Sequence, residues 1–364
     1  MILLTSTRQL LSNAIYRNSR HANLNFPMRN LMSKQLVYCE FGDPLEVVKC
    51  RESIVPPLGK TDVLVRMLAA PVNPADINTI QGRTPILPQL PHVPGDEGVG
   101  NVVEVGPLVS KIKIGDRVVL NTRLLGTWRY YGIYNERDLY VIPPHINLAD
   151  AAMLSIAPCS AYRMLKDYIK LQPGQTVVQN GANSAVGQSV IQLCRAWGVN
   201  TFNIVASHCG FEAVKKHLLN IGATCVLTLE EAEELTCFNT SLIRPILALN
   251  CLGGRHENVL LHLLRPYGHV VYYGCAYDLP LTKKCIRGDL TFHKFNLTDW
   301  MENKSDFLKR QIMFTDVTQL MVIGKHCPPI YEHVELKNYI YALRSTVHCE
   351  AFCNTYYLFD FTVL

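Results

Sequence analysis

Apolar residues between positions 34 and 142 form short runs or alternate with polar residues, and glycine or proline separates one run from the next. Alternation matches the two-residue period of a strand, so the pattern predicts strands at 36–38, 63–68, 98–105 and 116–120. We therefore expect the first part of the chain to be a β-rich domain, of a kind that could close into a barrel.

After residue 148 the pattern changes to alternating helices and strands. Apolar residues three and four positions apart predict helices at 148–168, 211–221 and 257–264. Short apolar runs predict strands at 176–178, 202–206, 224–227, 246–250 and 269–274. Such alternation predicts an α/β fold, a doubly wound parallel sheet covered on both faces. The last forty or so residues carry helical and then strand-like signals, too few for a separate domain.

The turn after the first of these strands is made of small residues. Val177 and Val178 predict a buried strand, and helical spacing begins near Gln188. Backbone N–H groups at such a turn, together with the helix N-terminus, can face a nucleotide pyrophosphate. The strict G-x-G-x-x-G pattern is not kept, because Ala182 and Ser184 stand at two of the glycine positions. Alone, the turn leaves a nucleotide site and a plain strand-to-helix turn equally open.

Composition narrows the class of protein. The 364 residues are enough for two domains. The net charge is +5, but the basic residues form no stripe with aromatic residues between them, so nucleic-acid binding is not expected. No apolar run approaches the ~20 residues of a membrane span. The 13 cysteines contain no C-x-x-C pair, which argues for a reducing compartment and against disulfides or structural zinc.

Residues 1–34 differ from the rest of the chain. They hold Arg8, Arg17, Arg20, Arg29 and Lys34, and no acidic residue precedes Glu40. This composition predicts a mitochondrial transit peptide, with a disordered basic tail as the alternative. A secretory signal is disfavoured because no apolar stretch of ~7–15 residues is present.

Several phrases of the sequence together resemble the medium-chain dehydrogenase/reductase superfamily, and within it the mitochondrial trans-2-enoyl-thioester reductases. These phrases lie at 68–78, 80–82, 95–98, 115–118, 126–129, 161–165, 180–188 and 247–254. The resemblance implies a GroES-like β-rich substrate domain at 35–158 and a Rossmann cofactor domain at 159–310. It also implies that residues 311–364 return to the substrate domain.

Zinc-dependent members of this superfamily use a Cys and a His in the segments that match 73–76 and 95–98. Neither residue type is present there, and Asp96 stands where the His would be. Without soft ligands at tetrahedral spacing we expect no metal. The resemblance then favours reduction of a conjugated double bond over alcohol oxidation.

This reaction needs a group that stabilises or protonates the developing enolate. In the related reductases a Tyr after the Ile-Gln-Gly phrase has this role, and the matching residue here is Thr84. A Thr hydroxyl is a poorer acid than a phenol, whose pKa is ~10, so Thr84 would orient a water or hydrogen-bond the enolate and activity would be reduced. Tyr130 and Tyr131 could replace the donor, although packing is the favoured interpretation for both.

The resemblance also gives candidate cofactor residues. Ser207 and His208 match the segment that binds the 2′-phosphate, and no acid that would bind a ribose follows the second strand, which favours NADPH. The pyrophosphate would contact Asn183, Ser184, Ala185 and Val186. The nicotinamide pocket would be lined by Tyr273, Gly274, Cys275, Ala276, Phe295, Asn296 and Leu297. Relatives have an Asn at Ala157, a Trp at Asn296 and a C-terminal Lys without a counterpart here.

The expected function is NADPH-dependent reduction of trans-2-enoyl thioesters of acyl carrier protein or CoA, in the fatty-acid synthesis of the mitochondrial matrix. The resemblance suggests a homodimer. Two alternatives stay open: a catalytically weakened paralogue that retains nucleotide or acyl-thioester binding, and a zinc-free quinone or enone reductase.

Overall fold

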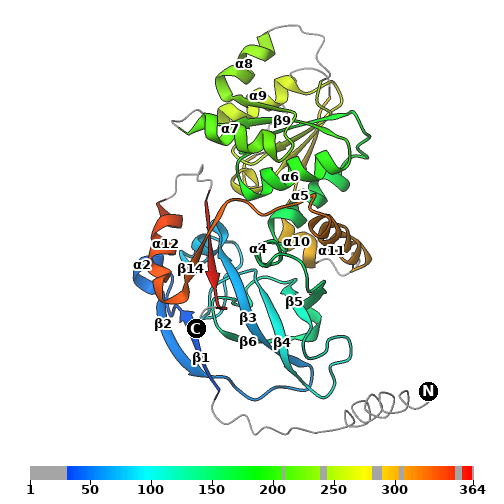
Figure 1. The fold of residues 1–364 in the computed structure, drawn as a ribbon. Helices are drawn as coiled ribbons and strands as arrows, with labels where there is room; N and C mark the ends of the chain where they lie inside the picture. Colours follow the sequence, from blue (N-terminus) through cyan, green and yellow to red (C-terminus); the bar gives the residue numbers. More distant parts are fainter. Residues whose placement is uncertain are drawn as a thin grey trace, which may run out of the picture.

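The computed structural model describes residues 31–206, 210–237, 244–280, 289–302, 307–348 and 355–362. Two sheets organise these residues, one mainly antiparallel and one parallel, and each belongs to its own part of the molecule (Figure 1). The predicted transit peptide, apart from residues 31–34, lies outside the described residues, as do Ser207 and His208. Among the described helices none combines the length and the apolar character that crossing a membrane requires.

The β-rich part is built on a seven-stranded sheet in the order β14-β15-β3-β4-β5-β7, with β6 also paired to β3. Its strands are β3 (Asp62–Val72), β4 (Val99–Val105), β5 (Arg117–Leu120), β6 (Tyr131–Asn135), β7 (Leu139–Ile142), β14 (Tyr331–Glu335) and β15 (Tyr356–Asp360). A smaller antiparallel pair joins β1 (Met32–Val37) to β2 (Lys49–Ile54). The short helices are α2 (Pro44–Val47), α3 (Pro74–Ile80) and α12 (Tyr339–Val347), with the 3-10 turns η1 (Glu136–Asp138) and η4 (Leu336–Asn338).

The parallel sheet has six strands in the order β10-β9-β8-β11-β12-β13. Numbered along the chain this is 3-2-1-4-5-6, the order typical of a Rossmann sheet. The strands are β8 (Thr176–Asn180), β9 (Asn200–Val205), β10 (Cys225–Thr228), β11 (Leu247–Asn250), β12 (His269–Tyr272) and β13 (Thr291–Lys294). Its helices are α5 (Ala157–Lys166), α6 (Ala185–Ala196), α7 (Phe211–Asn220), α8 (Leu229–Cys237), α9 (Gly254–Leu263), α10 (Leu297–Glu302) and α11 (Phe307–Val322), with the 3-10 turn η2 (Gly274–Ala276). The short helix α4 (Leu148–Ala152) precedes them and contacts β3 and β4 of the β-rich part.

Both faces of this sheet are covered, as the sequence pattern predicts. Val177 packs into a core with side chains of α5, α6 and α11, whereas its neighbour Val178 packs on the other face with side chains of α8 and α9. Successive strand residues point to opposite faces, so two layers of helices bury both. The predicted fold class, a doubly wound Rossmann sheet with a β-rich domain, is therefore confirmed.

The helix predicted over 148–168 is wrong as a single element. The chain forms α4 and α5, separated by residues 153–156. Pro158 stands in the first turn of α5, where its missing N–H and fixed φ are tolerated, whereas inside a longer helix it would break the hydrogen-bond ladder.

The chain returns to the β-rich part after α11. β15 pairs antiparallel with β3, so Phe359 stands opposite Ala70, and β14 adds to β15 in parallel. Figure 1 shows these red strands beside the blue β3. Trp128 and Phe359 meet edge to face, with ring centres 5.3 Å apart, inside the core of this domain. Sequence segments far apart therefore complete one sheet.

Candidate active site

The strand order places the topological switch point between β8 and β11, where connections leave the sheet in opposite directions and where ligands of open α/β sheets bind. Two buried amides hold the loops there. Asn180 Nδ2 donates to Asn250 Oδ1 at 2.7 Å, and the backbone N–H of Cys251 donates to Asn180 Oδ1 at 2.8 Å. The N–H of Gly253 donates to Asn250 Oδ1 at 3.0 Å. The ends of both strands are thereby fixed to each other.

The turn after β8 depends on two glycines. Gly181 has φ +58°, and a Cβ atom there would lie 2.6 Å from the sulfur of Cys251. A Cβ atom at Gly187 would lie 2.6 Å from the carbonyl oxygen of Ala182. Because only glycine allows this approach, only four residues separate the end of β8 from the start of α6, and the first N–H groups of α6 lie near the switch point. This backbone fits a dinucleotide pyrophosphate.

The predicted pyrophosphate residues form the start of α6. Ser184 caps the helix, since its Oγ accepts from the N–H of Gly187 at 3.1 Å. The carbonyl oxygen of Asn183 accepts from Gln188 Nε2 at 2.8 Å, which fixes the turn from inside. The N–H of Ala185 donates to the hydroxyl oxygen of Tyr356, at 2.9 Å, which comes from the first residue of β15. Nothing in the sequence pattern indicated this contact.

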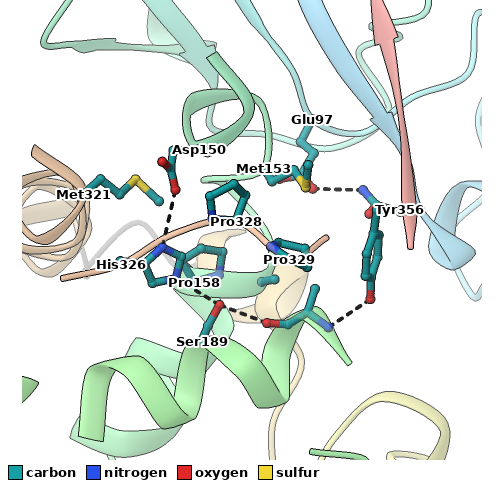
Figure 2. A pocket seen from close by; sticks show the side chains of 13 residues that line it. Glu97, Asp150, Met153, Pro158, Ser189, Met321, His326, Pro328, Pro329 and Tyr356 are labelled. Carbon is teal, nitrogen blue, oxygen red and sulfur yellow. Dashed lines mark hydrogen bonds and ion pairs between the residues drawn. The ribbon is translucent and has the colours of Figure 1, made fainter. Parts of the chain in front are cut away.

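A small cavity separates the start of α6 from the β-rich part. Its volume of about 10 Å³ is the space that a single water needs. Figure 2 shows Glu97 and Tyr356 on one side of it, with His326 and Ser189 on the other. It is lined by Asn73, Glu97, Asp150, Met153, Ala157, Pro158, Ala185, Ser189, Met321, His326, Pro328, Pro329 and Tyr356. Ala157, where relatives have an Asn, is thus part of the wall.

Glu97 is the buried acid of this wall. Its Oε1 accepts from Asn73 Nδ2 at 2.9 Å and its Oε2 accepts from the N–H of Ile156 at 3.1 Å. Burial raises the pKa of Glu97 to about 8, against the lowering effect of these two donors. The carboxyl group is therefore mostly protonated at neutral pH, and this wall of the cavity carries no charge from it.

His326 joins three segments around the cavity. Its Nε2 lies 3.2 Å from the hydroxyl oxygen of Ser189, and its Nδ1 lies 3.7 Å from Asp150 Oδ1. Ser, His and Asp are the residue types of a nucleophilic triad. Here, however, the hydroxyl of Ser189 donates its hydrogen to the carbonyl oxygen of Ala185 at 2.9 Å, so its oxygen accepts a hydrogen bond from His326 Nε2. The group serves to connect α4, α6 and the segment after α11.

Asp96, at the position of the zinc-binding His, is engaged in an ion pair. Its Oδ2 lies 2.6 Å from Arg123 Nε, and its Oδ1 accepts from the N–H of Leu124 at 2.9 Å. Arg123 Nη1 also donates to the hydroxyl of Thr298 in α10 at 3.1 Å, which links the two domains. Within the described ranges, no group of three or more His, Cys, Asp or Glu side chains is arranged to hold a metal ion.

Thr84 lies in the loop after α3, apart from the turn at the switch point. Its hydroxyl donates to the carbonyl oxygen of Ile86 at 3.0 Å, and the side chain is half-buried. Across the described part of the chain, no hydrogen bond connects it to the other candidate residues. Of the alternative donors, Tyr130 packs edge to face on Phe361 and Tyr131 lies in β6.

The predicted nicotinamide residues lie after β12 and β13. Tyr273 and Phe295 are buried in the core that also contains Val177, and the burial raises the pKa of Tyr273. Asn296 accepts from the N–H of Thr298 at 2.8 Å and so stands at the start of α10. After β12, Gly274 faces Cys251, Cys275 is exposed and Ala276 is buried. Leu297 is the first residue of α10.

Comparisons with known proteins agree with this architecture. The family profile of the alcohol dehydrogenase GroES-like domain matches residues 59–141. The mitochondrial enoyl-acyl-carrier-protein reductase of Mus musculus is 40% identical over 347 residues, which are 93% of this chain and 92% of the relative.

Two solved structures are also similar. The mitochondrial 2-enoyl thioester reductase Etr1p/Etr2p heterodimer of Candida tropicalis has a TM-score of 0.81 and 25% identity, and the match covers 91% of this chain and 100% of that one. A point variant of Etr1p in complex with NADP and crotonyl-CoA has a TM-score of 0.80 and 25% identity, over 91% of this chain and 99% of that one. The chain therefore belongs to the mitochondrial enoyl-acyl-carrier-protein reductase family of the medium-chain dehydrogenase/reductase superfamily.

Proposed function

We propose that the chain is an NADPH-dependent oxidoreductase that reduces the α,β double bond of trans-2-enoyl thioesters in mitochondrial fatty-acid synthesis. The observation that carries the proposal is the glycine-built turn at the switch point of the parallel sheet, in a chain whose relatives are named enoyl-acyl-carrier-protein reductases. The Etr1p variant holds NADP and crotonyl-CoA together, which supports the cofactor and the thioester class.

The turn would hold the pyrophosphate through the first amides of α6, between Asn183 and Val186. Ser207 and His208 stay the candidates for the 2′-phosphate. The residues after β12 and β13 would line the nicotinamide pocket, from Tyr273 to Ala276 and from Phe295 to Leu297. When bound, NADPH supplies a hydride to the β-carbon of the enoyl group. The protein's own residues then place the thioester and manage the charge and the proton of the enolate.

Thr84 is the residue that we propose for the proton step. Its hydroxyl must first turn away from the carbonyl oxygen of Ile86, to which it now donates. An alcohol is a weaker acid than a phenol, whose pKa is ~10, so Thr84 would orient a water or hydrogen-bond the enolate oxygen. We infer a slower proton step than that of an enzyme with a tyrosine at this position.

The acyl group would arrive on acyl carrier protein or CoA. For assembly we propose a homodimer, and the dimeric state of the Etr1p/Etr2p heterodimer supports a pair of chains. The relatives are named mitochondrial, and the basic, acid-free first 34 residues support import into the matrix. A fluorescent reporter fused to residues 1–34 should enter mitochondria, and a reporter that stays in the cytosol would contradict this location.

The test of the activity is NADPH oxidation with crotonyl-CoA, followed by the loss of NADPH absorbance. We expect turnover by the wild type and faster turnover by Thr84→Tyr. Thr84→Val removes only the hydroxyl and should lower kcat, by up to the ~10²–10⁴-fold that general acid–base catalysis supplies.

Other outcomes distinguish the alternatives. A silent wild type beside an active Thr84→Tyr variant would show that the natural chain is a weakened paralogue that only binds. Faster turnover with a quinone than with crotonyl-CoA would favour a quinone reductase. If NADPH fails to raise the melting temperature, the cofactor proposal is wrong, because a tight ligand stabilises the folded state.

A further inference from the structure

Tyr356 connects the returning strand β15 to the start of α6. Its own N–H donates to the carbonyl oxygen of Ile330 at 2.8 Å, and the residue pairs with Tyr331, so the sheet anchors its backbone. From there the side chain crosses the gap between the domains, and its hydroxyl oxygen receives the N–H of Ala185, 171 residues away. Figure 2 shows the ring beside Pro329 with the hydroxyl directed at this amide.

The amide that Tyr356 holds is one that a phosphate would need. The first N–H groups of a helix have no partner within the helix and form its anion-binding end. In α6, Ser184 already accepts from the N–H of Gly187. Tyr356 accepts from that of Ala185, so both donors are satisfied by the protein itself. A phosphate oxygen that binds the amide of Ala185 has to remove the phenol first.

The phenol is also suited to being displaced. Burial raises the pKa of the Tyr356 hydroxyl, against the lowering effect of the N–H of Ala185, so the hydroxyl is neutral at physiological pH. A neutral acceptor forms a weaker bond to an N–H group than a charged phosphate oxygen does, by about a factor of two in energy. The exchange of one for the other is therefore favourable.

We propose that the hydroxyl of Tyr356 occupies part of the dinucleotide site when the cofactor is absent. It accepts the hydrogen bond of the Ala185 amide until a pyrophosphate displaces it. This inference rests on the proposed function, because it concerns the same cofactor. Binding of the dinucleotide then breaks the hydrogen bond between the Ala185 amide and Tyr356, and a neutral hydrogen bond contributes a net of about 0.5–1.5 kcal/mol. Removal of the hydroxyl should tighten NADPH binding by about 2- to 13-fold.

The experiment is calorimetric titration of the full-length chain with NADPH, in the wild type and in Tyr356→Phe. Tyr357→Phe is the matched control, because Tyr357 is the next residue of β15 and packs against Tyr341 at 5.5 Å between ring centres. We expect a lower Kd for Tyr356→Phe and an unchanged Kd for Tyr357→Phe. Equal affinity of Tyr356→Phe and wild type would overturn the inference alone, and weaker binding would show that the hydroxyl is a ligand of the cofactor instead.

Failure of the proposed function gives a different result. If neither protein binds NADPH, the inference and the cofactor proposal are both wrong. If only Tyr356→Phe binds it, the hydroxyl is not displaced in the wild type, which overturns the inference and shows that the natural chain does not use the cofactor. Hydrogen exchange adds a test without any variant: the amide of Ala185 should exchange slowly in the cofactor-free wild type, and fast exchange would refute the contact.

Discussion

Replacing Gly187 with alanine tests whether the close approach of α6 to β8 makes the dinucleotide site. The new Cβ atom would lie 2.6 Å from the carbonyl oxygen and 2.7 Å from the Cα atom of Ala182. These are backbone atoms of a fully buried residue, so no side chain can rotate to make room. Ordinary contact begins near 3.4 Å, and the start of α6 must therefore move back by about 0.8 Å.

Two effects should follow from this movement. Overpacking in a buried region typically lowers the free energy of unfolding by about 1–3 kcal/mol. The amides of α6 also leave the position in which they reach a phosphate at ~2.9 Å. We expect the Kd for NADPH to rise at least about tenfold, which corresponds to about 1.4 kcal/mol of binding free energy.

Calorimetric titration and urea unfolding measure the two quantities. Gly42→Ala is the control, because a Cβ atom there meets only Cγ1 of the Val47 side chain, at 2.9 Å, and a small shift of that side chain relieves the contact. An NADPH affinity of Gly187→Ala equal to that of the control would refute the argument that this glycine positions the pyrophosphate amides.

Two further predictions concern buried charge. Because the pKa of Glu97 is raised to about 8 in the folded chain, the native state binds a proton that the unfolded state has released, and its contribution to stability should fall by about 1.4 kcal/mol per pH unit between roughly pH 4.5 and 8. The unfolding free energy of Glu97→Gln relative to wild type should therefore rise over this range, and a pH-independent difference would contradict the assignment. Arg123→Ala removes the ion pair of Asp96, whose carboxylate then keeps the hydrogen bond from the N–H of Leu124. Since the arginine is about one-third exposed, we expect a loss of roughly 2–3 kcal/mol, below the 3–5 kcal/mol of a fully buried pair, measured by urea unfolding with Arg123→Lys as the partial rescue.

The fold could be predicted because its main signals are local. Val177 and Val178 face opposite helix layers, and a strand buried on both faces leaves an apolar run that glycine-rich turns delimit. The break between α4 and α5 was missed because apolar spacing continues across residues 153–156, although Pro158 is a signal for the start of a new helix.

The candidate site was predictable only in part, because only some of its contacts are local in the sequence. Asn183 to Val186 form one continuous turn, so their neighbourhood can be inferred from the sequence, while their role toward the cofactor stays a prediction. Tyr356 carries no local signal, because its contact depends on the pairing of β15 with β3. Likewise, the raised pKa of Glu97 follows from burial by segments that are distant in sequence.

The pairing of β15 with β3 has a consequence for the order of events during synthesis. Tyr339 and Val48 hydrogen-bond across 291 residues, at 3.4 Å, and β15 pairs with the end of β3, from Ala69 to Val72. When the Rossmann sheet emerges from the ribosome, β3 still lacks this neighbour and presents unpaired backbone groups of the kind that promote association with other chains. The parallel sheet can therefore fold during translation, whereas the seven-stranded sheet is completed only after it, so nascent chains should depend on chaperones in this interval.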